Sequence, residues 1–418
     1  MWPSTRLGDC CDVLDRLRVP VNAEERDILQ GDIPYYGANG VQGYIDKFIF
    51  DEALILLAED GGYFDEYESR PIAYRISGKS WVNNHAHVLR GKAGSSFSQD
   101  FIFYCLEHKN IIPFIKGGTR AKLNQAELRE ILIPTPPEPT QRRIAEILST
   151  LDETIEQTEA LIAKHQQIKT GLMHDLFTRG LTPDGHLRPT RAEAPQLYKE
   201  SPLGWIPKEW DVAPLLRFAT TSSSAFVNGP FGSDLLTSEL RDSGVPVIYV
   251  MDIREDEYSR VAQAHVTESK ADSLMVCNVR YGDVLVAKVG DPPCLAAWYW
   301  ENSRAIVTQD VIRIRPADDV DTRLLASLIN SSVGRKAIRK ITIEGTRARV
   351  SLTEFKQILL PKPSHEEQER IARKLASLQA QLSMSSKELV KLSALKHGLM
   401  HDLLTGRVGV KVAAPTPA

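Results

Sequence analysis

The sequence predicts an α+β protein that is a pseudo-two-fold tandem repeat: two α/β domains separated by two long antiparallel helices, which form a coiled-coil spacer. Two observations predict this architecture. The back part of the first half of the chain returns in the second half, and each copy of it carries apolar residues at helical spacing. A fixed internal period indicates a duplicated unit, and apolar residues three and four apart are typical of a helix that packs along one face.

The repeat is clearest from position 118 onward. The tetrapeptide Gly-Thr-Arg-Ala at 118–121 returns at 345–348, and the hexapeptide Gly-Leu-Met-His-Asp-Leu at 171–176 returns at 398–403, both at an offset of 227 residues. Between 118 and 178, 24 of 61 ungapped positions match the second copy. Composition alone would give about one match in fifteen, so this part of the chain is duplicated.

The front parts of the two copies are related but have diverged. Trp2 corresponds to Trp210 at an offset of 208, and residues 82–84 correspond to 307–309 at an offset of 225. The second copy is therefore roughly 19 residues longer in front. We interpret the back parts as doing one task twice, and the front parts as doing two different tasks of one kind.

Each shared back part is predicted to form one long helix. The apolar seams consist of Ile144, Leu148, Leu151, Ile155, Ile162, Leu172 and Leu176, and of Ile371, Leu375, Leu378, Leu382, Leu389, Leu392, Leu399 and Leu403. Polar residues interrupt the seams at Thr158, His165, Lys169, Ser385 and Lys396. Each helix would span ~60 Å, and the simplest arrangement is an antiparallel coiled coil. Separate docking of each helix on its own domain is the alternative.

These patterns divide the chain into six segments. They are a first α/β domain (1–138), a first spacer helix (139–180), a linker rich in Gly, Pro and charge (181–204), a second α/β domain (205–363), a second spacer helix (364–406) and a flexible tail (407–418). Apolar runs at 53–57 and 283–287 predict strands, and 324–340 has a helical pattern.

Composition sets limits on location and on partners. No stretch reaches 18 uncharged apolar residues and no secretory signal opens the chain, so we expect no membrane span and a cytoplasmic location. The cysteines Cys10, Cys11, Cys105, Cys277 and Cys294 have no metal-ligand spacing and are expected to be reduced thiols. The net charge of -3 means that any nucleic-acid binding must rest on local charge.

Catalytic and metal motifs are incomplete. The segment Asp291-Pro292-Pro293-Cys294 resembles the motif of amino-methyltransferases, but Cys294 stands where an aromatic ring would stack on the target base. We interpret this segment as a turn. Gly78-Lys79-Ser80 lacks the first glycine of a phosphate-binding loop, and His85 and His87 lack a further ligand nearby. We therefore predict no catalytic residue, no metal site and no cofactor bound by the chain itself.

Basic residues gather around the repeated Gly-Thr-Arg-Ala segments. Residues 335–349 hold six basic side chains and one acidic, and the first copy has a thinner version that includes Lys122. Glycine lets a phosphate approach the backbone, while threonine and arginine contact phosphates or base edges. A solvated helix face followed by a turn is the alternative for 335–340.

Two loop-like stretches are rich in small, aromatic and amide residues. They are Tyr35-Tyr36-Gly37-Ala38-Asn39-Gly40 and Asn228-Gly229-Pro230-Phe231-Gly232-Ser233. Asparagine can donate to and accept from adenine, whereas Tyr35 and Phe231 could equally be core anchors.

Several strings resemble those of the specificity subunits of type I restriction-modification systems. They are residues 33–44, 83–89, 201–210 and 229–233, together with the paired Pro-x-Pro, Gln-x-Arg-Ile-Ala and Gly-Leu-Met-x-Asp-Leu segments. The resemblance follows the family's order of domains and covers almost the whole chain up to Arg407.

The resemblance implies a role and a set of partners. Each domain would be a target-recognition domain that binds one half of a split, asymmetric site on double-stranded DNA. The helices would set the gap and dock two modification subunits, which carry the S-adenosylmethionine chemistry, with restriction subunits as optional partners. The low net charge suggests that these subunits supply part of the phosphate contacts.

We predict that DNA contacts come from both domains. Base contacts are expected near Tyr36, Asn39, Asn83, Ser233 and Lys288, and phosphate or positioning contacts from the Gly-Thr-Arg turns. The full predicted set is Tyr36, Gly37, Asn39, Asn83, Asn84, His85, Gly118, Thr119, Arg120, Lys122, Gly232, Ser233, Lys288, Arg335, Arg339, Gly345, Thr346, Arg347 and Arg349. The alternatives are a self-contained adenine methyltransferase that uses Asp291 to Cys294, and a scaffold without a DNA role.

Overall fold

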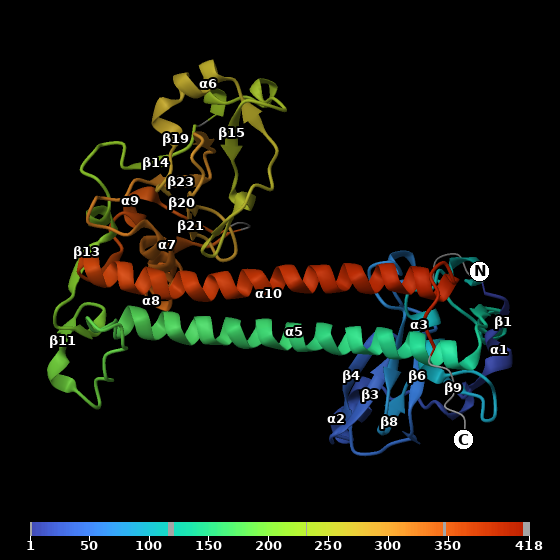
Figure 1. Ribbon diagram of the computed structural model, residues 1–418. Coiled ribbons are helices and arrows are strands. Elements are labelled where there is room, and N and C mark those ends of the chain that lie inside the picture. The colour runs from blue at the N-terminus through green and yellow to red at the C-terminus, as the bar shows by residue number, and fades with distance from the viewer. Residues whose placement is uncertain (1, 116–120, 231, 346–347, 413–418) are drawn as a thin grey trace. The chain divides into compact units, whose positions relative to one another are not determined.

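The structure is a computed structural model that describes residues 2–115, 121–230, 232–345 and 348–412. The chain forms two compact units: Met1–Ala160 with Ser386–Ala418 (unit 1), and Leu161–Ser385 (unit 2). Each unit combines one α/β domain with half of each long helix (Figure 1). None of the helices in the described part of the chain has both the length and the apolar character that a bilayer crossing requires.

Unit 1 contains two four-stranded sheets. The first is antiparallel, in the order β2 (Cys11–Val13), β9 (Ala86–Gly91), β6 (Leu54–Ala58) and β7 (Ala73–Ile76). The second has the order β4 (Gly40–Ile45), β3 (Ile33–Gly37), β8 (Lys79–Val82) and β5 (Phe50–Asp51), with β3 and β8 parallel. The smaller elements are β1 (Ser4–Arg6), β10 (Leu132–Pro134), α1 (Leu7–Cys10), α2 (Ala23–Ile28), α3 (Gln99–Glu107) and α4 (Gln125–Arg129).

The strand β6 explains why the run at 53–57 is continuously apolar. All five of its residues are buried, because the sheet is covered on both faces. Ile55 and Leu57 join a core with α3 and the ends of the long helices, whereas Leu54 and Leu56 face a core shared with β5 and β8. Strands buried on both faces carry apolar residues without alternation.

Unit 2 repeats this arrangement strand for strand. Its first sheet has the order β14 (Phe226–Asn228), β23 (Val311–Ile314), β20 (Val284–Ala287) and β21 (Leu295–Trp298). Its second has the order β18 (His265–Val266), β15 (Val245–Ile248), β22 (Ala305–Val307) and β19 (Asn278–Val279), with β15 and β22 parallel. The remaining elements are β13 (Asp211–Pro214), β26 (Leu359–Lys362), β16 (Ile253–Arg254), β17 (Glu257–Tyr258), β24 (Thr342–Ile343), β25 (Arg349–Val350), α6 (Glu268–Ser273), α7 (Thr322–Asn330), α8 (Ser332–Arg339) and α9 (Leu352–Phe355).

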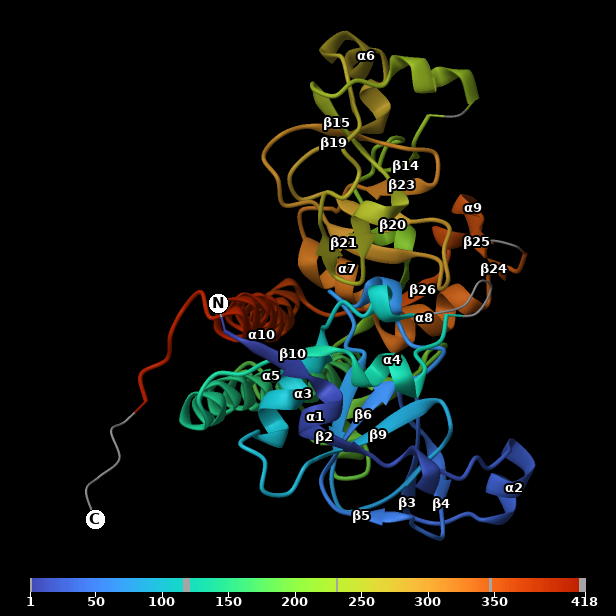
Figure 2. The same cartoon turned by 90° about the vertical axis from the view of Figure 1, so that its right-hand side faces the viewer.

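The layers of unit 2 are visible from two directions. Helix α7 lies on the sheet that contains β20, and the sheet that contains β15 lies beyond it (Figures 1 and 2). Val284 and Val286 pack toward α7, while Leu285 and Ala287 pack toward β15 and β22. The two units therefore share one topology, which confirms the predicted tandem repeat of α/β domains.

The long helices are α5 (Glu138–Thr178) and α10 (His365–Thr405). In unit 1, Lys396 of α10 reaches Asp152 of α5 (Nζ–Oδ1 2.6 Å). In unit 2, Lys169 of α5 donates to Gln379 of α10 (3.1 Å). Residues later in α5 thus meet residues earlier in α10, which is antiparallel packing, as predicted. The two lysines occupy equivalent repeat positions, so these interruptions of the apolar seam are cross-helix contacts.

A buried glutamine fixes the start of each long helix. Gln141 donates to the carbonyl of Pro136 (2.9 Å), and Gln368 donates to that of Pro363 (3.0 Å). The amide oxygens accept from the backbone N–H groups of Ser98 and Asp321, the N-cap residues of α3 and α7 (3.1 Å each). These contacts explain why the Pro-x-Pro and Gln-x-Arg-Ile-Ala segments recur together.

A glycine packs against a tryptophan ring at the end of each long helix. Gly180 and Gly406 have φ angles of 67° and 74°, which favour glycine, and a Cβ on either would clash with the ring of Trp210 or Trp2. The Trp2 indole donates to the carbonyl of Leu403 (3.0 Å). The repeated tryptophan and glycine therefore form one packing motif in each unit.

Two segments differ from the expectation. The segment 181–204, expected as a surface linker, is folded: β11 (Tyr198–Ser201) pairs with β12 (Gly204–Pro207), and Arg188 is buried against Glu367. The helical pattern at 324–340 is divided into α7 and α8, because Ser331 caps the second helix by accepting from the N–H of Gly334 (3.2 Å). Of the expected tail, 413–418 lie outside the described residues.

Candidate nucleic-acid interface

Those predicted contact residues of the first copy that the structure describes come together at one edge of unit 1. We call residues 36–40, 59–62, 83–85 and 121–123 the unit 1 loop edge. The N–H of Asn83 donates to the carbonyl of Tyr36 (2.9 Å), and the amide of Asn39 donates to the carbonyl of Gly61 (2.9 Å). His85 contacts Asp60 (2.6 Å), and Asp60 pairs through its backbone with Lys122.

Some side chains of the unit 1 loop edge are exposed, whereas others are buried and bonded within the domain. Asn83 is 3% exposed; its amide donates to Gln42 (3.1 Å) and its oxygen accepts from the N–H of His85 (2.8 Å). Asn84 is exposed. Tyr35 is a core anchor, buried with its hydroxyl bonded to Val21, whereas Tyr36 is half-buried beside Tyr74. Contact between Asn83 and a base would therefore require its two internal hydrogen bonds to break.

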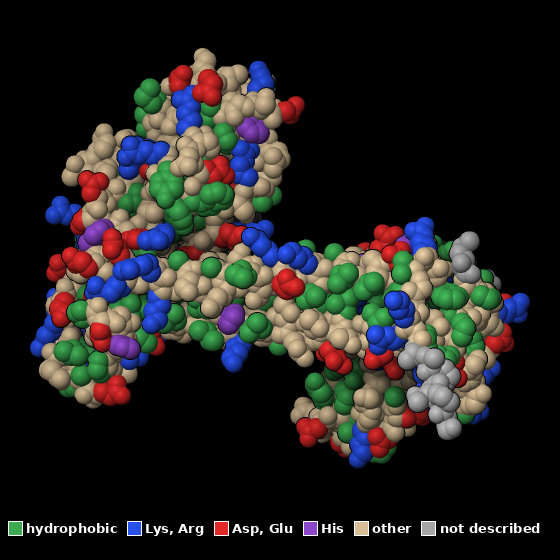
Figure 3. Space-filling model, viewed as in Figure 1, with side chains coloured by type: hydrophobic (Ala, Val, Ile, Leu, Met, Phe, Trp, Pro, Cys, Tyr) green, Lys and Arg blue, Asp and Glu red, His purple; other side chains and the backbone are tan. Residues whose placement is uncertain are grey.

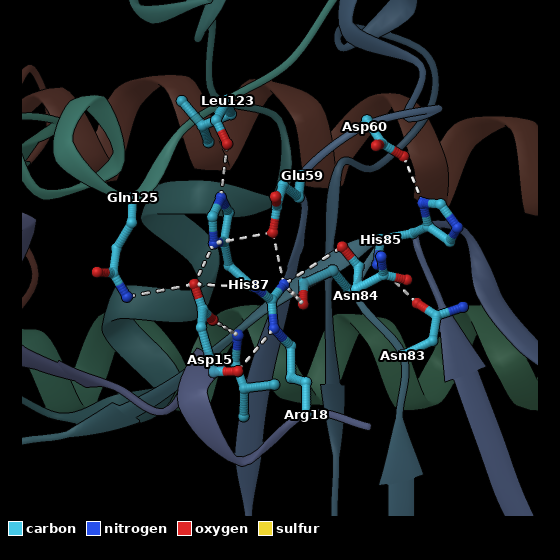
Figure 4. Close-up of polar contacts among 12 residues, drawn as sticks. Asp15, Arg18, Glu59, Asp60, Asn83, Asn84, His85, His87, Leu123 and Gln125 are labelled. Atoms are coloured by element: carbon cyan, nitrogen blue, oxygen red, sulfur yellow. Dashed lines mark hydrogen bonds and ion pairs between the residues drawn. The ribbon is translucent and has the colours of Figure 1, made fainter. Parts of the chain in front are cut away.

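A network of charged residues supports this edge from beneath (Figure 4). Glu59 contacts Arg18 (2.5 Å) and Lys122 (2.9 Å), and His87 contacts Asp15 (2.7 Å) and the carbonyl of Leu123 (2.8 Å). Burial alone would raise the pKa of Asp15 and of Glu59. Hydrogen bonds and charges from His87 and Arg18, and from Lys122 at Glu59, outweigh burial and hold both pKa values below their ordinary range.

The same network contains a group of potential metal ligands. One ligand atom from each of Asp15, Glu59 and His87 lies within 4.8 Å of the others. Arg18 and Lys122 already contact Glu59, and the Nε2 atom of His87 must donate to the carbonyl of Leu123. Because side-chain cations and a peptide carbonyl satisfy these groups, we interpret them as an ion-pair network that holds β6, β9 and the segment around residue 15 together.

In unit 2, residues of the predicted DNA-contact set line a cleft of about 1150 Å³. Gly232, Arg335, Arg339 and Gly345 line this unit 2 cleft. Lys288 and Arg349 lie on adjacent backbone segments beside it, since Val289 bridges to Arg349. The side chain of Ser233 is not described, and Gly118, Thr119, Arg120, Phe231, Thr346 and Arg347 lie outside the described residues.

Residues 289–293, in the connection between β20 and β21, form one wall of the cleft. Cys294 is fully buried with a φ of 60°, and the peptide bond between Asp291 and Pro292 is cis. Arg335 donates to the carbonyls of Pro293 (2.6 Å) and Cys294. The segment is a turn between β20 and β21, as interpreted from sequence, and Cys294 occupies the place that an aromatic residue holds in the methyltransferase motif. Arg335 positions this wall, while its predicted contact with DNA stays a prediction.

The sequence argument missed most of the cleft residues, including three that follow a strand of the repeat. Thr308, Gln309 and Asp310 line the cleft and follow β22 as Asn83, Asn84 and His85 follow β8. The offset of 225 residues already placed 307–309 opposite 82–84, so the repeat held the signal. On the face shown in Figure 3, basic and acidic side chains are interspersed over both units rather than separated into two fields.

The α/β domain is present in two copies, and each copy packs on an antiparallel pair of helices. This arrangement defines the class: a two-domain recognition protein in which one scaffold presents two sets of loops that differ in sequence. The model of the type I restriction modification DNA specificity domain matches residues 1–167 and 235–393. The chain belongs to this family.

Named relatives agree with the family match. The chain is 24% identical over 428 residues to the type I restriction enzyme MjaVIII specificity subunit of Methanocaldococcus jannaschii, covering 98% of this chain and 93% of that protein. It is 23% identical over 389 residues to the EcoBI specificity subunit of Escherichia coli (91% and 77%). A 38% identical match to a specificity subunit of Haemophilus influenzae spans 35% of this chain and only 36% of that protein.

Solved structures share the fold. The S subunit of a type I restriction-modification system from M. genitalium has a TM-score of 0.64 at 16% identity, covering 97% of this chain and 96% of that chain. A chain from a structure of the type I R-M system, described in terms of complex assembly and conformational transition, has a TM-score of 0.51 at 16% identity (97% and 98%).

Proposed function

We propose that the chain is the non-catalytic DNA-recognition subunit of a type I restriction-modification complex. Each α/β domain binds one half of a split, asymmetric site in the major groove of double-stranded DNA, and the helix pair sets the gap between the halves. The observation that carries this proposal is the strand-for-strand repetition of one scaffold whose loop edges differ in sequence.

The partners follow from the family and from the long helices. Two modification subunits would dock on α5 and α10 and bring the S-adenosylmethionine chemistry, with restriction subunits as optional members. Apolar side chains on these helices support docking, since Leu161, Ile168, Val390 and Leu395 are 44–70% exposed. Contiguous exposed apolar surface is typical of a contact site, and these side chains would contribute to one on each unit.

The methyl transfer is assigned to the partners. The segment that resembles a methyltransferase motif buries Cys294 completely and uses its carbonyl to accept from Arg335. We therefore propose that the isolated chain transfers no methyl group and serves to place its partners on the DNA.

A domain exchange tests the division of labour. Residues 1–138, which end where α5 begins, are replaced by the corresponding segment of another family member, and the chimera is expressed with its modification partner. Mapping of methylated adenines in the DNA should show one half-site changed, with the other half and the gap retained. A change in both halves, or in neither, would refute separate recognition by the two domains.

A further inference from the structure

An exposed amide side chain stands at the same place in both domains. Strand β8 pairs in parallel with β3, with Val82 opposite Tyr36, and β22 pairs in parallel with β15, with Val307 opposite Ile248. The next N–H group, of Asn83 or Thr308, donates to the carbonyl of Tyr36 (2.9 Å) or Ile248 (3.1 Å). Asn84 and Gln309 are therefore equivalent by hydrogen-bond register as well as by sequence.

The residue before each exposed amide, Asn83 or Thr308, forms hydrogen bonds within its own domain. Asn83 is buried and uses its amide oxygen and nitrogen within the domain, and the hydroxyl of Thr308 donates to the carbonyl of Ile248 (3.0 Å). These bonds fix the backbone from which the following side chain projects. A displayed group held by a fixed backbone keeps its position on binding, which favours specific contacts.

The side-chain amides of Asn84 and Gln309 are available for contacts with a ligand. Within the described ranges, the side chains of Asn84 and Gln309 have no hydrogen-bond partner, and both residues are exposed. Gln309 also lines the unit 2 cleft, together with Arg339 and Gly290. The cleft thus combines a free donor and acceptor with a basic side chain.

The chemistry of an amide selects among the groups that DNA offers. A phosphate presents only acceptors, so it would leave the amide oxygen unpaired. Adenine presents an N7 acceptor beside an N6 donor in the major groove, and this pair matches asparagine or glutamine in a bidentate contact. Because the net charge of the chain is low, hydrogen bonds between neutral groups are a suitable means of distinguishing one base pair from another.

We propose that Asn84 and Gln309 each recognise an adenine, one in each half of the DNA site. This assignment rests on the proposed function. It names two specificity-determining residues and separates them from their neighbours Asn83 and Thr308, which hold the backbone.

The test uses the full chain assembled with its modification subunits and a pool of duplexes with randomised half-sites. Variants Asn84→Ala and Gln309→Ala are compared with Gln196→Ala, an exposed glutamine just before β11 and outside both long helices. Each test variant should lose about 5- to 150-fold of its preference for an A·T pair, at one position of one half-site. The other half-site and the salt dependence of binding should remain unchanged, and Gln196→Ala should behave as wild type.

The outcomes separate the two proposals. If wild-type complex selects no sequence at all, the proposed function fails, and this assignment with it. If wild type selects a split site and the variants select the same bases with the same stringency, only the adenine assignment is overturned. A uniform loss of affinity with a shallower salt dependence would place these residues on the backbone and overturn it too.

Discussion

The unit 1 loop edge and the equivalent backbone segments of unit 2 differ in charge at one position. In unit 1, Glu59 follows β6 and pairs with Lys122 (2.9 Å), while Asp60 bridges to Lys122 through the backbone. In unit 2, Lys288 follows β20, and Val289 bridges to Arg349. The repeat places Lys122 opposite Arg349, so an ion pair in one domain is replaced by two basic residues in the other.

This exchange shows what the duplicated scaffold holds constant. The strand register and the backbone bridges persist, because they satisfy peptide groups whatever the side chains are. The side-chain charge does change, since Glu59 is buried among Arg18 and Lys122, whereas Lys288 at the equivalent position is half-buried. Divergence of the front parts therefore alters what the domain displays while its fold is retained.

The buried carboxylates also differ in location. Unit 1 has its network beneath the loop edge, around Glu59. Unit 2 has one at the start of α10, where Glu367 contacts Arg188 (2.9 Å) and accepts from the indole of Trp210 (3.0 Å). The repeat position of Glu367 in unit 1 is Thr140, which offers no charge.

The largest expected effect comes from removing the carboxylate at the helix start of unit 2. Glu367→Gln leaves Arg188 buried without its main partner, which should lower the free energy of unfolding of unit 2 by about 3–5 kcal/mol. Hydrogen exchange should show faster opening of β11 and β12. The control is Glu209→Gln, because Glu209 contacts the same arginine but its side chain is 73% exposed, so a loss of about 0–1 kcal/mol is expected. Equal losses in the two variants would contradict this interpretation.

Acid should weaken unit 1 through Asp15 and Glu59. Their pKa values are depressed in the folded state, so their stabilisation is complete above the ordinary carboxyl pKa of about 4 and is lost as the pH falls below it. Hydrogen exchange measured from pH 5 to pH 3 should show protection of β6 and β9 decreasing. In Asp15→Asn the protection should be lower at neutral pH and vary less with pH. An unchanged pH profile in that variant would exclude Asp15 as a source of the effect.

The sequence allowed the scaffold to be predicted because the repeat and the apolar seams are local patterns. The fixed offset revealed the duplication, and the seams revealed α5 and α10 to within a few residues. Side-chain partners could not be predicted, because they depend on contacts between distant segments. Lys169 and Lys396 were noted only as interruptions of the seams, and the burial of Asn83 or of Arg188 has no signature in their neighbours along the chain.

The smallest expected effect tests the difference in charge between the loop edges. Within the described residues, neither Lys288 nor Arg349 has an acidic side-chain partner, so both are available to a phosphate, whereas Lys122 is paired with Glu59. Lys288 lies beside the cleft rather than on its wall, which favours a phosphate contact over the base contact expected from sequence. Each phosphate contact releases counterions and steepens the dependence of log K on log salt by about 0.9. Lys288→Gln and Arg349→Gln should each make that slope shallower by about this amount, and Lys122→Gln should change it by much less.

A similar change in all three variants would mean that the ion pair between Lys122 and Glu59 in unit 1 opens when DNA binds. If Lys288→Gln loses discrimination at one base pair while the salt slope stays unchanged, Lys288 contacts a base, as the sequence predicted.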